Sequence, residues 1–269
     1  MLELESAGGL DAELAAADLW ERGATGLEWR DGAGAVTLVA SFPTSEACIR
    51  VARVVGARAV EISDASWRDT WKAHAVPLRV APSLVVKPAW RAVRLPSTHV
   101  VVDLDPGPCF GSGTHASTRL ILAALASSPP RDKAVLDLGC GSGILSVTAA
   151  LLGAGEVLAL DVDPEAIRVT RSNARRNQVG SRVDARLGTA ATLERAWQGR
   201  FDLALVNVTA GVHAQVAGEV VNVLRPGASV ILAGMLPGQW EHVESYYAPC
   251  QTREMLSLDG WIGVILSKG

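Results

Sequence analysis

The middle of the chain runs Val135-Leu136-Asp137-Leu138-Gly139-Cys140-Gly141-Ser142-Gly143-Ile144-Leu145, an apolar strand that leads into a glycine turn and then opens a helix. Glycines at such a turn carry no side chain that would keep a ligand away from the backbone. The spacing is G-x-G-x-G, and Ile144 stands where a dinucleotide-binding fingerprint has its third glycine. The turn therefore predicts a bound nucleotide-type ligand and weakens the case for a dehydrogenase.

An acidic residue ends the next predicted strand. Asp161 follows Gly139 by 22 positions, and its carboxylate can accept hydrogen bonds from both hydroxyls of a ribose. Asp163 and Pro164 then begin a helix, as its N-cap and its first residue. A glycine turn followed by an acidic strand end indicates an adenosine-type ligand.

From Lys133 onward, strands alternate with helices of about 10 to 15 residues, which is typical of a parallel sheet with helices on both faces. The sequence thus predicts an α/β fold that closes with an antiparallel hairpin around Asp259-Gly260. The predicted parallel strands are 135–139, 157–161, 183–187, 202–208 and 229–235, and the hairpin strands are 252–258 and 261–267.

Residues 1–62 predict a smaller α+β domain in front of this fold. Short strands and helices follow in the order βαββαβ, which suggests a ferredoxin-like sandwich with a turn at Asp31-Gly32. The expected helices cover 10–22 and 45–55, and the later strands lie near 26–30, 35–41 and 58–62.

Residues 63–104 are expected to join the two domains, so that the larger domain covers 105–269. A linker helix is predicted before Pro77, which cannot continue a helix. Strand-like segments at 84–86 and 100–104 then form a lip. The aromatic and basic residues at helical spacing in the linker are Trp67, Trp71, Lys72 and His74.

Asn207 ends the fourth predicted strand, where ligands gather in an open parallel sheet. Its amide offers a donor and an acceptor, enough to orient the methionine part of a cofactor or an incoming amine. Asn207 can equally be a cap for the helix that begins near Ala210. Both interpretations stay open at this point.

A second glycine-rich loop, residues 105–115, leads into a helix before the first core strand. Its hydroxyls, ring and imidazole stand in front of the glycine turn, which suggests a lid over the site. Thr118 lies in the first turn of that helix and can hydrogen-bond a carboxylate there. His115 is either a substrate ligand or a loop histidine.

Charge and composition narrow the function classes. A net charge of −3 argues against a nucleic-acid partner held mainly by phosphate neutralisation. Residues 1–65 carry 11 acidic and 5 basic side chains, a balance of −6 that can attract a basic protein or simply be a solvated face.

The apolar runs are too short for a membrane span, and the N-terminus lacks a secretory signal, so a cytoplasmic protein is expected. The dispersed cysteines, Cys48, Cys109, Cys140 and Cys250, do not suggest a metal site.

The loop Phe110-Gly111-Ser112-Gly113-Thr114-His115-Ala116-Ser117-Thr118 resembles the F-G-T-G-T-H-x-T-T loop of the PrmA family, the methyltransferases of ribosomal protein L-eleven (L11). The resemblance covers roughly residues 60–250, and covers the front domain by size and strand order only. The other similar segments, in the same order as in that family, are the tryptophan-rich linker, VLDLGCGSGILS, DVDPEAI with Asn173 and Asn177 after it, and VLRPGASVILAGML.

The resemblance implies a Rossmann-like class I methyltransferase domain that uses S-adenosyl-L-methionine. Its reaction would be an in-line attack of an unprotonated lysine or terminal amine on the sulfonium methyl group, with no dedicated base required. The protein substrate would be L11, gripped by the front domain, and the enzyme is expected to be a monomer. Phe110 and His115 are candidate substrate contacts. The implied cofactor contacts are Thr118, Gly139, Gly141, Asp161 and Asn207.

Departures from the family pattern concern the substrate side. The family's N-I-L-A is Asn207-Val208-Thr209-Ala210 here, which adds a hydroxyl beside the acceptor pocket, and the loop has Ser112, Ala116 and Ser117 where Thr, Pro and Thr are common. The alternative functions are methylation of another protein lysine, a free amino acid or a small amine, and a non-catalytic module that binds an adenosine ligand.

Overall fold

The computed structural model describes residues 2–6, 10–24, 26–31, 36–42, 44–59, 75–193 and 197–269. The chain divides into two compact units, Met1–Ala75 and Val76–Gly269. The predicted linker residues Trp67, Trp71, Lys72 and His74 lie outside the described residues, as do Gly32 of the predicted turn and residues 60–62 of a predicted strand. The domain boundaries at residues 62 and 104 stay a prediction.

The first unit has the predicted βαββαβ order. Its elements are β1 (Leu2–Ser6), α1 (Leu10–Glu21), β2 (Gly26–Asp31), β3 (Val36–Ser41), α2 (Ser45–Val55) and β4 (Arg58–Ala59). The strand order β2-β3-β1-β4, with every neighbouring pair antiparallel, is that of the ferredoxin-like sandwich. The helices bury Leu19, Val51 and Ala52 against Leu38 and Ala40 of β3.

A small three-stranded sheet begins the second unit. Residues 75–77 are irregular, in agreement with the inability of Pro77 to continue a helix. The strands are β5 (Leu78–Ala81), β6 (Leu84–Pro88) and β7 (Val100–Leu104); β6 pairs antiparallel with β5 and parallel with β7. These strands bury Leu84, Val86, Val102 and Leu104 in the same core cluster as the helix of residues 116–127. The predicted lip is therefore part of this unit's core.

The large sheet has seven strands in the order β10-β9-β8-β11-β12-β14-β13. The first five are parallel, and β14 runs antiparallel between β12 and β13, as a closing hairpin requires. The α/β prediction is therefore confirmed. The strands are β8 (Ala134–Leu138), β9 (Glu156–Asp161), β10 (Val183–Leu187), β11 (Phe201–Asn207), β12 (Leu224–Met235), β13 (Gln251–Leu258) and β14 (Trp261–Ser267).

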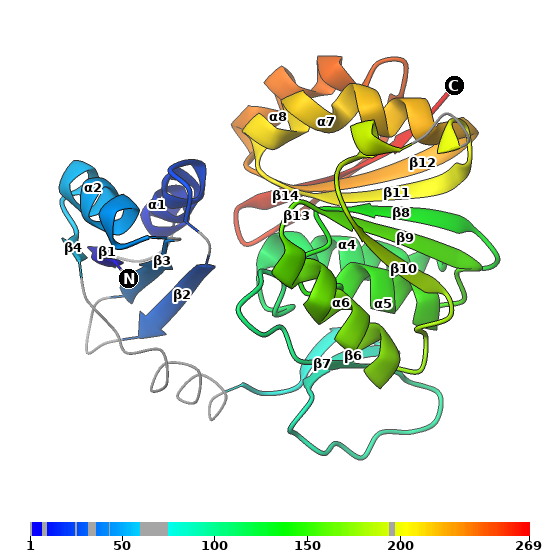
Figure 1. Ribbon diagram of the computed structural model, residues 1–269, viewed down its shortest axis with the longest axis horizontal. Coiled ribbons are helices and arrows are strands. Elements are labelled where there is room, and N and C mark those ends of the chain that lie inside the picture. The colour runs from blue at the N-terminus through cyan, green and yellow to red at the C-terminus, as the bar shows by residue number, and fades with distance from the viewer. Residues whose placement is uncertain are drawn as a thin grey trace. The chain divides into compact units, whose positions relative to one another are not determined.

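Helices cover both faces of this sheet (Figure 1). The helices of one face are α4 (Ala116–Ser127), α5 (Ile144–Leu151) and α6 (Pro164–Arg176). The other face has α7 (Ala210–Val223) and α8 (Pro237–Val243), with short 3₁₀ turns at Ala190–Thr192 and Glu244–Tyr247. The direction of the chain across the sheet reverses between β8 and β11, and in such sheets ligands bind at the carboxyl ends of the strands beside that point.

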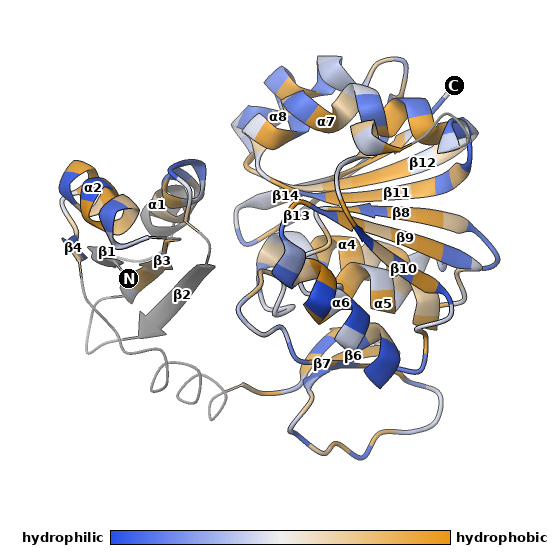
Figure 2. Ribbon diagram, viewed as in Figure 1, coloured by the Kyte–Doolittle hydropathy of each residue, from blue (hydrophilic) through white to orange (hydrophobic). Residues whose placement is uncertain are grey.

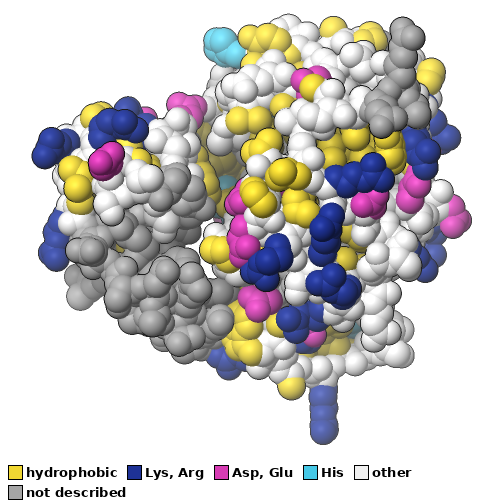
Figure 3. Space-filling model, in the orientation of Figure 1, with side chains coloured by type: hydrophobic (Ala, Val, Ile, Leu, Met, Phe, Trp, Pro, Cys, Tyr) yellow, Lys and Arg dark blue, Asp and Glu magenta, His cyan; other side chains and the backbone are white. Residues whose placement is uncertain are grey.

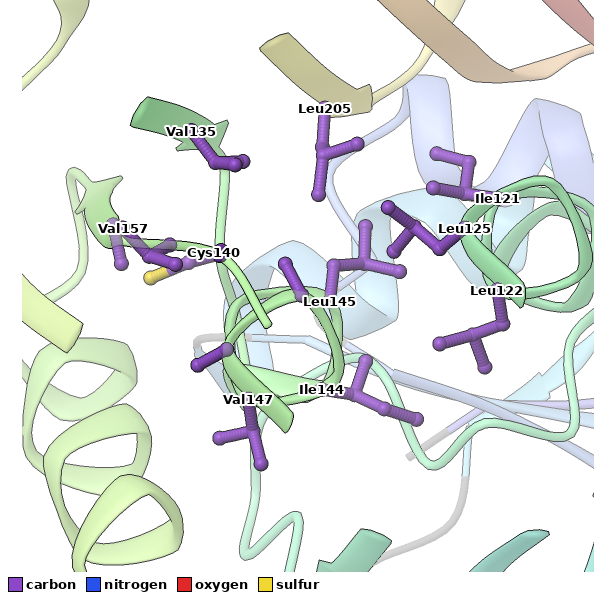
Figure 4. Close-up of a cluster of buried hydrophobic side chains, with 14 of the residues drawn as sticks. Ile121, Leu122, Leu125, Val135, Cys140, Ile144, Leu145, Val147, Val157 and Leu205 are labelled. Carbon is purple, nitrogen blue, oxygen red and sulfur yellow. The ribbon is translucent and has the colours of Figure 1, made fainter. Parts of the chain in front are cut away.

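Parallel strands covered on both faces should read as mostly apolar runs, and the central strands β9 and β11 do so (Figure 2). Val135 of β8 faces one core cluster, whereas Leu136 and Leu138 face the other. Figure 4 shows the first cluster, where the side chains of α4 and α5 meet those of β8 and β11. Within the described part of the chain, no helix has the length and apolar character needed to cross a membrane.

Candidate functional site

The glycine turn after β8 uses its glycines for different purposes. Gly139 is exposed at the carboxyl end of the strand, with φ of 73°, and its N–H donates to the carbonyl of Leu160 at 2.8 Å. A Cβ at Gly141 would lie 2.7 Å from the carbonyl oxygen of Phe110, and one at Gly143 would lie 2.7 Å from Oγ1 of Thr170. Packing therefore requires the second and third glycines, and Gly139 leaves backbone that a ligand can reach.

Asp161 ends β9 beside this turn, as the sequence predicts. One carboxylate oxygen accepts from the N–H of Gly141 at 2.9 Å, and the other accepts from the N–H of Asp163 at 3.0 Å. A carboxylate offers about four acceptor positions, so the half-buried group keeps capacity for two further donors. The predicted N-cap is also present, because Asp163 accepts from the N–H of Glu165 at 2.8 Å.

Two exposed apolar side chains flank Asp161, and the sequence analysis missed both. Val162 is 71% exposed and Leu187, at the end of β10, is 58% exposed. Leu187 pairs directly with Asp161 in the sheet. Large apolar side chains at the carboxyl ends of neighbouring strands offer a surface for a flat apolar group such as a purine base. The signal in the sequence was an apolar residue immediately after the acidic strand end.

Asn207 at the end of β11 is brought together with Thr118 of α4. The Asn207 Nδ2 donates to the Thr118 Oγ1 at 3.1 Å, and Thr118 is fully buried. The N-cap of α7 is Thr209, whose side chain makes no capping hydrogen bond. Asn207 is therefore not the helix cap, and it lies at the same carboxyl edge of the sheet as Gly139.

The ring of His115, at the end of the loop before α4, packs against two aromatic rings. Its Nδ1 accepts from the N–H of Ser117 at 3.3 Å and caps α4. The ring lies edge-on to Phe110, with centroids 5.5 Å apart, and to Trp261 of β14 at 4.6 Å. Burial lowers the pKa of His115 to about 4, so the ring is neutral near pH 7. Trp261 was not expected from the sequence, because nothing local links it to this loop.

Beneath the glycine turn, Asp137 of β8 is a fully buried carboxyl. Its Oδ2 accepts from the N–H of Ser146 at 3.0 Å and from the Ser146 hydroxyl at 2.5 Å. Among the described residues, Oδ1 has no hydrogen-bond partner. Burial raises the pKa of Asp137 to about 7, against the opposing effect of the Ser146 hydrogen bonds.

On the other side of the sheet, His213 of α7 supports the residues that follow Asn207. A carbonyl only accepts, so the Nε2 of His213 donates to the Ala233 carbonyl at 2.9 Å, and its Nδ1 accepts from the Tyr247 hydroxyl at 2.8 Å. Burial lowers the pKa of His213 to about 4. A Cβ at Gly234 would collide with the Val208 carbonyl, so Gly234 of β12 packs directly against the backbone that follows Asn207.

Charged side chains of both signs lie near one another on the face that carries α6 and β10 (Figure 3). Arg168 pairs with Glu165 at 2.5 Å, and Arg186 pairs with Asp184 at 2.6 Å. These neighbouring charges neutralise one another locally, so the pairs give no support for a surface of a single sign.

Comparison with known proteins assigns the family. The family described as Ribosomal protein L11 methyltransferase (PrmA) matches residues 37–269. A protein of that name from Sorangium cellulosum is 36% identical over 88% of this chain and 79% of its own length. Another, from Syntrophotalea carbinolica, is 44% identical over 63% of this chain, and the match spans 55% of that relative's length.

A solved structure agrees with this assignment. A ribosomal protein L11 methylase from Lactobacillus delbrueckii subsp. bulgaricus is 27% identical, with a TM-score of 0.64 over 72% of this chain and 98% of that one. The resemblance predicted from the loop and the glycine turn is confirmed. This chain belongs to the family of ribosomal protein L11 methyltransferases, with the class I methyltransferase fold.

Proposed function

We propose that this chain transfers methyl groups from S-adenosylmethionine to lysine or N-terminal amino groups of ribosomal protein L11. Family membership over residues 37–269 carries the proposal, together with a carboxyl edge that places Gly139, Asp161 and Asn207 at neighbouring strand ends. The proposed site of action is the cytoplasm, where ribosomal proteins are made, and the proposed form is a monomer.

The residues at this edge fit S-adenosylmethionine. The exposed backbone at Gly139 admits a ligand, and the Asp161 carboxylate has free acceptor positions for the two ribose hydroxyls. Val162 and Leu187 would cover the base, and Asn207, positioned by its hydrogen bond to the buried Thr118, would hold the polar methionine end. When bound, the cofactor supplies an electrophilic methyl group on a positively charged sulfur.

The chain's own contribution is to orient an amine and to exclude water. The amide oxygen of Asn207 can accept from the incoming amino group, because its Nδ2 is already engaged with Thr118. His115 is neutral near pH 7 and so adds no positive charge that would repel an ammonium group. A lysine has to lose its proton before it reacts, and the half-buried surroundings of Asn207 favour the neutral amine.

The front unit is the proposed grip on the protein substrate. Its acidic balance of −6 over residues 1–65 suits a basic ribosomal protein. Thr209 is the position at which we expect the acceptor pocket to differ from that of relatives, because its hydroxyl makes no capping bond and follows Asn207 by two residues.

The test is incubation of the full chain with methyl-labelled S-adenosylmethionine and purified L11, followed by mass spectrometry of the peptides. Labelled lysine or N-terminal peptides are expected, and the Asp161→Ala variant should give far less label. Label on other lysate proteins or small amines, with none on L11, would change the assigned substrate. Binding of the cofactor with no transfer to any of these would make the chain a non-catalytic module.

A further inference from the structure

One asparagine joins the loop in front of the site to the glycine turn. Asn173 of α6 is fully buried. Its Nδ2 donates to the carbonyl of Asp105 and to the carbonyl of Ser142, both at 2.9 Å, and its Oδ1 accepts from the N–H of Asp105 at 3.0 Å. A single side chain thus holds the base of the site loop, residues 105–115, and the turn that faces the cofactor.

Ser142 of the glycine turn holds the middle of the same loop. Its N–H donates to the carbonyl of Phe110 at 2.9 Å, and its hydroxyl donates to the carbonyl of Gly111 at 2.7 Å. Ser142 is fully buried, so water cannot replace these partners without a rearrangement. The loop is therefore fixed to the turn at two separate places.

Packing between the loop and the turn leaves no room for one more carbon. A Cβ at Gly111 would lie 2.7 Å from the Ser142 hydroxyl, and a Cβ at Gly113 would lie 2.9 Å from the end of Ile144. Gly141 approaches the Phe110 carbonyl just as closely. The two segments fit as one packed body, unlike a flap that rests on a surface.

A second asparagine, at the C-cap of the same helix, provides a natural comparison. Asn177 lies four residues after Asn173 and also makes three side-chain hydrogen bonds. Its Nδ2 donates to the carbonyls of Asp103 at 2.7 Å and Asn173 at 2.8 Å, and its Oδ1 accepts from the N–H of Asp103 at 2.8 Å. Asn177 thus anchors β7 in front of the loop, and none of these bonds reaches the glycine turn.

We propose that Asn173 is a positioning residue that makes the site loop and the glycine turn open and close as one unit, so that the loop is not an independent lid. Separating them would leave the Asn173 amide and the Ser142 groups without partners in a buried place, and each lost bond reduces the open population about tenfold. The loop then keeps Phe110 and His115 at a fixed position relative to the glycine turn. The inference rests on the proposed function only in taking this site as the cofactor site.

Hydrogen exchange in the free wild-type protein tests the proposal without a mutation. The N–H groups of Asp105 and Ser142 report the two ends of the unit, because one donates to Asn173 and the other to Phe110. Equal opening free energies are expected for both, with equal increases when S-adenosylhomocysteine is added. An Asp105 amide that exchanges more than about tenfold faster than that of Ser142 would show an independent lid and overturn the proposal.

The matched variants Asn173→Ala and Asn177→Ala separate positioning from stability. Asn173→Ala should raise exchange at both Asp105 and Ser142, and raise the Kd for S-adenosylhomocysteine about tenfold above that of Asn177→Ala. The kcat at saturating cofactor should differ little between the two. Equal Kd values and equal loop exchange in both variants would show that Asn173 has only a structural role and would overturn the proposal.

Two further measurements keep a failure to fold, and a failure of the proposed function, distinct from a failure of this proposal. If Asn173→Ala does not fold, Ser142→Ala removes the bond to the Gly111 carbonyl, together with the acceptor of the Ile144 N–H, and should still raise the exchange of the loop amides. A wild-type protein that binds no S-adenosylhomocysteine would contradict the proposed function, whereas the coupled exchange of Asp105 and Ser142 in the free protein would stand.

Discussion

The carboxyl edge of the large sheet has two halves that are built in different ways. At the ends of β8, β9 and β10, backbone groups make the site: the N–H groups of Gly139 and Cys140 donate to the Leu160 carbonyl, and Asp161 accepts from the N–H of Gly141. We call these strand ends the cofactor half. Positive φ and close approach leave glycine as the only residue that fits there without strain.

The ends of β11 and β12 with α7, the acceptor half, are held by side chains from distant parts of the chain. Asn207 reaches Thr118, which lies 89 positions before it, and His213 reaches Tyr247. Substitutions in the cofactor half should therefore cost both binding and stability, whereas the acceptor half can change its preference for a substrate through single side chains such as Thr209.

The largest expected effect is that of Gly141→Ala in the cofactor half. The new Cβ would lie 2.7 Å from the Phe110 carbonyl at φ of 52°. We expect calorimetry to show at least a hundredfold weaker binding of S-adenosylhomocysteine, and denaturant unfolding to show a loss of about 2 to 5 kcal/mol.

The control for Gly141→Ala is Gly211→Ala in the acceptor half. A Cβ there meets nothing within 4 Å, and the residue lies in α7. Alanine should raise stability by up to about 1 kcal/mol and leave binding unchanged. Similar losses in both variants would show that the two halves do not differ in this respect.

Asp161→Ala should cost about 1.5 to 3 kcal/mol of cofactor binding, because charged hydrogen bonds to the ribose are lost. Isothermal calorimetry measures this directly. Asp163→Ala is the neighbouring control: it removes the cap on the N–H of Glu165 and should cost about 0.5 to 2 kcal/mol of stability with affinity retained. Unchanged affinity in Asp161→Ala would refute the assigned ribose contact.

The two halves should respond to pH in opposite directions. His213 has a folded pKa of about 4, below the ordinary value of about 6.5, so the unfolded chain binds more protons and stability falls as pH drops from 6.5 to 4. Asp137 has a folded pKa of about 7, above its ordinary value of about 3.9. The folded chain therefore binds more protons at this group, and stability falls as pH rises from 4 to 7.

Denaturant unfolding between pH 4.5 and 6.5, in about half-unit steps, checks these signs. Asp137→Asn should make stability rise more steeply with pH, and His213→Asn should make it rise less steeply. Each change is at most about 1.4 kcal/mol per pH unit, the value for one proton. A change in the same direction in both variants would contradict the assignment.

The smallest effect is the coupling between Thr118 and Asn207. A double-mutant cycle with Thr118→Val and Asn207→Ala, measured on the rate of methyl transfer, should give about 0.5 to 1.5 kcal/mol for their hydrogen bond. Thr118→Ser keeps the hydroxyl and serves as the control. Additive losses would mean that the two side chains act separately.

Sequence reasoning reached the cofactor half more fully than the acceptor half, for a physical reason. The glycines and Asp161 act through local backbone, so spacing along the chain predicts their neighbourhood. Asn207 could not be distinguished from a helix cap until the structure placed it against Thr118. Trp261 and His115 meet only because β14 lies between β12 and β13, which no local pattern specifies.

The order of the strands also affects how the protein can be made. β14 is an interior strand of the sheet, with Val264 and Leu266 almost fully buried, although it follows all of the other described strands in the chain. Until β14 has emerged from the ribosome, β12 presents an open edge that can pair with another chain. We therefore expect β8 to β12 to form a partial sheet while the chain is still on the ribosome. The acceptor half of the sheet should then be completed after the cofactor half.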